Sequence, residues 1–116
     1  MRIDPKFQNT LTYWAVSDEI GEVIARYMID GLQPGGFFRS VLANDMIGAM
    51  PRSHPSNSVI ALGNLCRWIF ETAPAESWGS YEKVDAWCRL TIEQREKILL
   101  DHNLIQNVFE MLADNY

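Results

Sequence analysis

This sequence of 116 residues has few cysteines, no long apolar run and no excess of basic residues. The two cysteines occur without C-x-x-C spacing, and no H-E-x-x-H is present, which argues against a disulfide-built fold and against a zinc site. The apolar runs are only a few residues long, so no membrane span is expected. Met1 to Gln8 has no apolar run of the kind that forms a signal peptide. Sequence repeats and flexible linkers are also missing, which predicts one domain.

The net charge is −5, from 15 acidic and 10 basic residues. A general nucleic-acid binder needs a basic face that neutralises phosphates, so this charge argues against DNA or RNA as a partner. An acidic surface more often reflects solubility, and sometimes a basic protein partner. Apolar residues make up 47% of the chain, with four Trp, five Phe and four Tyr, which is enough for a sizeable core.

Helical periodicity dominates after residue 16. Ser17 is a predicted N-cap, and Gly31 is placed to end the first helix in the left-handed conformation. A second helix is predicted over 37–50, with Met46 and Ala49 among its buried positions, and is stopped by Pro51. The third helix begins after Ser56 or Ser58 and ends at Pro74. It carries a stripe of apolar residues that is expected to be buried: Leu62, Leu65, Cys66, Ile69, Phe70 and Ala73.

A short helix is predicted after Ser80, and Thr91 with Gln94 matches a capping box at the start of a last helical region, 92–113. The polar segment 101–103 leaves two alternatives for this region, two short helices or one helix with a polar turn. Residues 1–16 are expected to form a partly extended arm. The prediction is an all-α fold: a compact single-domain bundle of four to six helices over residues 17–116, preceded by an N-terminal arm, residues 1–16.

The first candidate ligand site is the loop that contains Gly35 and Gly36. Two residues without a Cβ atom let a partner come close to the backbone, and the helix that follows offers unpaired N–H groups. Phe37 would stack on a base, and Arg39 would pair with a phosphate. The structural alternative is a tight connection between helices whose Phe residues pack on the core.

The second candidate site is the loop Trp78, Gly79 and Ser80. It again places a glycine, a hydroxyl group and an aromatic ring at a helix start, with Lys83 one turn into the helix. If this helix start and the one at Gly36 face the same cleft, both would point at one anion or nucleotide. The structural alternative is a buried Trp that anchors a loop.

The remaining polar residues favour structural roles. Asp45 is expected to bind the backbone of the first loop, His54 and His102 to be solvated, and Cys66 and Cys88 to be buried, reduced thiols of a cytosolic protein. A charged face on the last helical region is also expected to be solvated: Glu93, Arg95, Glu96 and Lys97. No catalytic motif is present, so neither an enzymatic activity nor a cofactor is predicted.

A longer pattern contains Pro34-Gly35-Gly36-Phe37, then Asn44-Asp45, then Trp78-Gly79-Ser80-x-Glu82-Lys83-Val84-x-Ala86-Trp87. It resembles a group of small, uncharacterised proteins encoded by tailed bacteriophages, over roughly residues 24 to 88. The resemblance implies a small accessory protein in the cytoplasm of an infected bacterial cell.

Accessory proteins of this kind often bind and inhibit host machinery or sequester a signalling nucleotide. One hypothesis is therefore a non-enzymatic binder that inhibits a host protein or defence complex. The other is a nucleotide- or phosphate-binding protein that uses the two glycine-containing helix starts. Exposed apolar residues on the last helix also leave room for a homodimer.

Overall fold

The computed structural model describes residues 3–52 and 58–114, and every element in these two ranges is helical. The all-α prediction is confirmed, although these ranges hold eight α-helices rather than four to six. In chain order the elements are α1 (Pro5–Tyr13), α2 (Asp18–Asp30), α3 (Gly36–Leu42), α4 (Met46–Ala49), the 3-10 turn η1 (Met50–Arg52), α5 (Val59–Thr72), the 3-10 turn η2 (Ala75–Ser77), α6 (Tyr81–Arg89), α7 (Ile92–Asp101) and α8 (Val108–Asp114).

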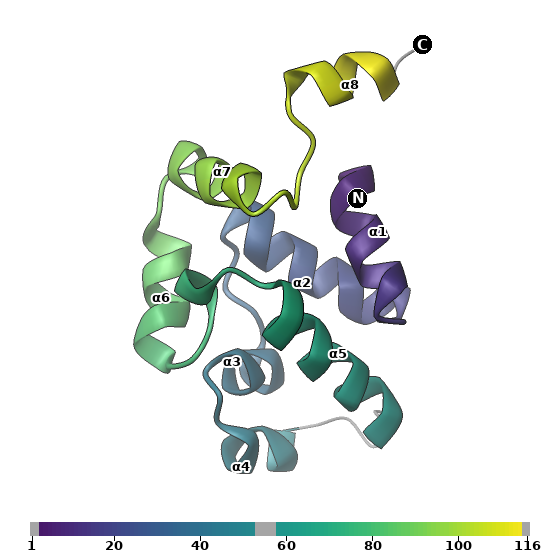
Figure 1. The fold of residues 1–116 in the computed structure, drawn as a ribbon. Coiled ribbons are helices and arrows are strands. Elements are labelled where there is room, and N and C mark those ends of the chain that lie inside the picture. The colour runs from purple at the N-terminus through teal and green to yellow at the C-terminus, as the bar shows by residue number, and fades with distance from the viewer. Residues whose placement is uncertain (1–2, 53–57, 115–116) are drawn as a thin grey trace.

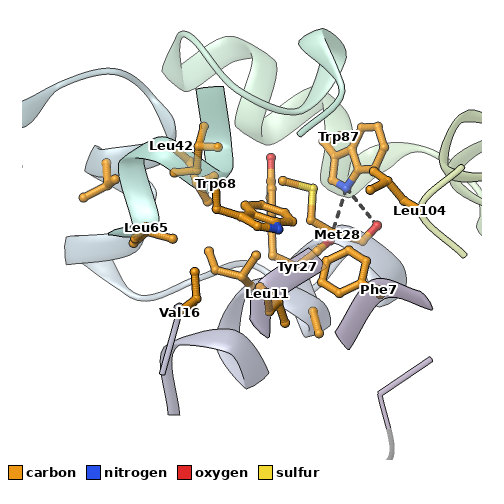
Figure 2. Close-up of a cluster of buried hydrophobic side chains, with 14 of the residues drawn as sticks. Phe7, Leu11, Val16, Tyr27, Met28, Leu42, Leu65, Trp68, Trp87 and Leu104 are labelled. Carbon is orange, nitrogen blue, oxygen red and sulfur yellow. Dashed lines mark hydrogen bonds between the residues drawn. The ribbon is translucent and has the colours of Figure 1, made fainter. Parts of the chain in front are cut away.

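Helix α2 passes through the middle of the molecule, with α1 and α5 on one side and α6 and α7 on the other (Figure 1). The core lies around this helix, and its largest fully buried side chains are Trp68, Trp87 and Tyr27 (Figure 2). Their polar atoms are paired: the Trp68 indole N–H donates to Thr10 Oγ1 at 2.9 Å, and the Tyr27 hydroxyl donates to the Ser77 carbonyl at 2.8 Å. Aromatic rings therefore fill the core without leaving their polar ends unpaired.

Residues 5–13 are a helix, so the prediction of a partly extended N-terminal arm is wrong. Asp4 caps α1 by accepting from the backbone N–H groups of Lys6 and Phe7, and Pro5 occupies the first helical position. Phe7 and Leu11, four residues apart, are both buried against the core. An Asp-Pro pair before apolar residues at this spacing is itself a helix-start signal, and it outweighs the β-branched and aromatic residues that follow.

The single helix predicted over 37–50 is also wrong, because the chain breaks after α3. Asn44 adopts a left-handed conformation with φ 62°, and Asp45 then caps the separate helix α4 by accepting from Gly48 N–H at 2.9 Å. Asn and Asp favour turns and caps because their side chains bond to nearby backbone groups. Met46 was expected to be buried and is instead exposed, whereas Ala49 is buried as expected.

The other helix ends follow their predicted caps. Ser17, Ser58, Ser80 and Thr91 are the N-caps of α2, α5, α6 and α7, and Thr91 forms the full capping box with Gln94. The last helical region resolves into two helices, because the chain leaves α7 at Asp101 and α8 begins at Val108. Phe70, expected in the core, is 72% exposed.

The C-terminal end of α2 is held by side chains from two other helices. The Trp87 indole of α6 donates to the carbonyls of Tyr27 and Met28, both at 3.2 Å (Figure 2). Arg95 of α7 donates to the carbonyls of Ile29 and Asp30 at 3.2 and 3.1 Å. The prediction that Arg95 is solvated is wrong, since its residue exposure is 4%.

We predict that Gly31→Ala lowers the free energy of unfolding by about 2 kcal/mol or more. Gly31 has φ 71°, and a Cβ atom there would overlap the Arg95 guanidinium. Gly35→Ala is the matched control, because Gly35 has an ordinary φ of −62° and no atom near the position of a Cβ. Urea unfolding checks both variants. Equal losses for the two would show that the Gly31 turn and Arg95 do not constrain each other.

Candidate functional site

The first predicted site lies at the start of α3. Gly35 is the N-cap and is exposed, and Gly36 is the first helical residue, covered on one side by the Arg52 side chain. Phe37 is half-buried against the core. Arg39 is already engaged: its guanidinium binds both carboxylate oxygens of Asp85 at 3.0 and 3.1 Å.

The second predicted site lies at the start of α6. The Gly79 N–H donates to the Leu42 carbonyl at 2.8 Å, so it closes the end of α3. The Ser80 hydroxyl caps α6 by accepting from Lys83 N–H at 3.1 Å. The Lys83 ammonium donates to the Ala75 carbonyl at 3.1 Å. The residues of this loop are therefore engaged with the protein itself.

The two glycine-containing helix starts lie at opposite ends of the contact between α3 and α6. Gly79 meets Leu42, the last residue of α3, whereas Asp85 meets Arg39 and Gln33, toward the start of α3. The two helices therefore run antiparallel. Since α3 spans about 10 Å at 1.5 Å per residue, the two helix starts do not point at a common anion.

A polar network connects α3, α4, η1 and α6 instead. The Tyr81 hydroxyl donates to Asp45 and lies 3.1 Å from Ser40 Oγ. Arg52 donates to the same Ser40 oxygen at 3.0 Å and to the Gly48 carbonyl at 3.0 Å. The Arg39 guanidinium lies 4.7 Å from the centre of the Tyr81 ring, in cation–π geometry. Asp45 thus binds α4 and α6, and the prediction that it binds the first loop is wrong.

The hydrogen bonds of this network shift the pKa values of its carboxyl groups. The Tyr81 hydroxyl, followed by Gly48 N–H, holds the pKa of Asp45 below its ordinary value. Gln33 and then Arg39 hold the pKa of Asp85 below its ordinary value. Both carboxylates are therefore kept ionised, which suits an acceptor and does not suit a general acid.

An apolar hollow of about 370 Å³ lies between α3, α4, α5 and the loop before α6. Its polar edge is supplied by Asn44 and by the Cys66 thiol, and the pKa of that thiol is raised by burial. Trp78 and Phe70 form one wall, with ring centres 6.4 Å apart in an edge-to-face arrangement. The lining residues come from α3, α4, α5 and the loop before α6: Val41, Asn44, Met46, Cys66, Ile69, Phe70 and Trp78.

Further apolar residues are exposed on the two helices that line the hollow, α4 and α5, and on the turn η1 that follows α4. Ile47 and Met50 follow Met46 on the α4 side, and their side chains are 87% and 51% exposed. Val59 and Ile60 begin α5 and are also exposed. We call this set, together with the hollow, the α4–α5 apolar surface. Large exposed apolar patches on monomeric proteins often mark a site that binds another molecule.

Sequence reasoning identified Trp78 as a site residue and missed the rest of this surface. Phe70 and Cys66 were instead predicted to lie in the core. Cys66 and Cys88 were both predicted to be buried, and both are half-buried free thiols, Cys66 at the hollow and Cys88 on α6. The sequence signal that could have revealed this surface is the Asn44-Asp45 pair, since these residue types favour turns and helix caps. The left-handed turn at Asn44 directs α4 away from the axis of α3. His102 is exposed at the end of α7 as expected, and His54 lies outside the described residues.

Residues 3–52 and 58–114 contain no group of three or more His, Cys, Asp and Glu side chains placed to hold a metal ion. Within the same ranges no helix has the length and apolar character needed to cross a membrane. Comparison with protein-family models, curated proteins and solved structures found no match to this chain.

We predict that Asp45→Asn destabilises the protein at pH 7 and that this difference shrinks as the pH falls below 3.8. The folded state lowers the pKa of Asp45 from 3.8, so its ionised form contributes stability above that value and loses it as the pH falls through the lower folded pKa. Asn still caps a helix, so the variant removes mainly the charge. Urea unfolding of both proteins from pH 7 downward measures the difference. A difference that does not change with pH would contradict this role of the carboxylate.

Proposed function

We propose that this protein is a non-enzymatic binding protein that recognises another protein through the α4–α5 apolar surface. The observation that carries the proposal is the hollow walled by Phe70 and Trp78, beside which Met46, Ile47 and Met50 are exposed. Aromatic and Met side chains are enriched in the buried centres of protein interfaces. A side chain of the partner entering the hollow would be surrounded on several sides, as interface anchors are.

The polar residues of the chain support binding rather than catalysis. Asp45, Tyr81, Ser40 and Arg52 are hydrogen-bonded to one another, and Arg39 is paired with Asp85. A nucleophile needs an adjacent base, and a general acid needs a raised pKa. This network holds α4 against α6 and thereby fixes one wall of the hollow.

The proposed partner is a protein of a bacterial host. This part of the proposal rests on the resemblance to tailed-phage accessory proteins, which implies a protein that acts in the cytoplasm of an infected bacterial cell. In this proposal the protein covers a surface of a host protein or defence complex and thereby inhibits it. The α4–α5 apolar surface would make the contact, and the polar groups of the α3–α6 network are paired within the protein itself.

We predict that Phe70→Ser abolishes capture of the host partner by the tagged full-length protein. Phe109→Ser is the matched control, because Phe109 is 82% exposed and belongs to α8, which lies away from α4 and α5 in Figure 1. Gly63→Lys is a second test: no atom lies near the position of its Cβ, so the new side chain is accommodated on α5 beside the surface. Quantitative pull-down from bacterial lysate, with melting temperatures as the folding check, measures the effect.

We expect the wild-type protein and Phe109→Ser to capture the same host protein in equal amounts, and Phe70→Ser and Gly63→Lys to capture none of it. Retention that is equal in all variants would show that the α4–α5 apolar surface is not the interface. Lysates of several bacterial species that yield no specifically retained protein would contradict the proposed function itself. Size-exclusion chromatography of the purified variants distinguishes loss of a second copy of the chain from loss of a foreign partner.

A second candidate function is the binding of a small ligand, because Trp78 was predicted as a ligand-binding residue and lines the hollow. A volume of about 370 Å³ falls within the range of small-molecule pockets. An aromatic ring of the ligand would pack on Trp78, and Asn44 would bind its polar edge.

For this candidate we predict that a nucleotide at 100 times its Kd raises the free energy of unfolding by about 2.7 kcal/mol. The stabilisation should disappear in Trp78→Leu, whereas Arg26→Gln, on α2 and outside the lining of the hollow, should keep it. A thermal-shift screen against nucleotides is the measurement. No shift with any of them would leave protein binding as the function of the surface.

A further inference from the structure

The folded body of the protein ends near Ile105. Leu104 and Ile105 are buried, at 3% and 8% exposure, and both belong to the core. The next residues lead away from the body to α8, which stands apart from the other helices in Figure 1. Residues 106 and 107 are therefore the position where the chain can bend without disturbing buried side chains.

The helix beyond this point is held by little apolar packing. Its apolar side chains are exposed and lie outside the core: Val108, Phe109, Met111 and Leu112. It is seven residues long, and a helix of that length is marginal in water unless its apolar face is buried. The energy that keeps α8 in place must therefore come mainly from polar contacts.

Those contacts converge on Glu110. Its carboxylate accepts from the Lys6 ammonium of α1 at 2.8 and 3.1 Å, and it accepts from Asn107 N–H at 3.3 Å. Asn107 in turn accepts from Glu110 N–H at 2.9 Å, so the pair forms a reciprocal cap at the start of α8. One further bond joins Gln106 N–H to Asp4 at 3.2 Å.

We propose that α8 is a releasable arm, which opens about residues 106–107 while the rest of the protein stays folded, and that the Lys6–Glu110 ion pair sets how often it opens. The pair is partly exposed, with side-chain exposures of 24% and 38%, so it is weak and sensitive to salt. Opening moves the α8 segment, with its exposed apolar side chains, away from α1 on the connection at residues 106–107. Helices that open locally in this way come from the least stable parts of a fold.

Hydrogen exchange of the full-length protein tests the proposal. Amides of α8 should exchange about 100-fold or more faster than those on the buried side of α2. Lys6→Gln, which leaves the sequence of α8 and its cap unchanged, should accelerate α8 exchange about two- to five-fold without changing α2 or α5. Lys6→Arg should restore the wild-type rate. Arg26→Gln breaks the Glu22–Arg26 ion pair, which lies within α2, and should leave α8 unchanged.

Two results would overturn the proposal. In the first, α8 amides exchange as slowly as those of α2, which means that the helix opens only when the whole protein unfolds. In the second, Lys6→Gln leaves α8 exchange unchanged or accelerates all helices equally, which means that the ion pair does not control the arm. Wild-type α8 exchange in 1 M salt should match that of Lys6→Gln, because salt screens the pair.

Discussion

The fold depends most on the way Arg95 and Trp87 hold the carboxyl ends of two helices. The Arg95 guanidinium is buried and donates to the carbonyls of Ile29 and Asp30 at the end of α2 and to those of Trp87 and Leu90 at the end of α6. Carbonyl groups at a helix end carry partial negative charge, so they stabilise a cation without a carboxylate. Hydrogen bonds to a charged group contribute about 1.5–3 kcal/mol each, and here they join α2, α6 and α7 at one point.

The α4–α5 apolar surface depends on this junction through a sequence of contacts. Because α6 is fixed by its carboxyl end, its first turn places Tyr81 beside Ser40 and its middle places Asp85 beside Arg39. These contacts position α3 antiparallel to α6, and Tyr81 also holds Asp45. Asp45 caps α4, whose Met46 lines the hollow. A change at the Arg95 junction should therefore reach the surface through α6 rather than through the core.

Local signals predicted the helix ends well and tertiary placement poorly. Ser17, Gly31, Ser80 and the Thr91–Gln94 box were correctly assigned, because a cap depends on the few residues around it. Arg95 was assigned to a solvated face, since its burial depends on carbonyls that lie 65 and 66 positions away in sequence. The two glycine-containing helix starts were each predicted correctly, because a helix start is a local feature. Whether the two starts converge depends on how α3 packs against α6, and their antiparallel packing shows that they do not.

The break between α3 and α4 made the prediction of a single helix over 37–50 wrong. The same break exposes residues of the α4–α5 apolar surface. If residues 37–50 formed one helix, Met46 would lie one turn after Leu42 on the same buried face. Asn44 in a left-handed conformation costs about 1 kcal/mol or more, and it redirects α4 so that Met46 and Ile47 are exposed. Asp45 offsets part of that cost with two hydrogen bonds, to Gly48 and Tyr81. The exposure of Met46 and Ile47 therefore follows from the local turn and cap chemistry of Asn44 and Asp45, which a stripe of apolar residues at helical spacing does not reveal.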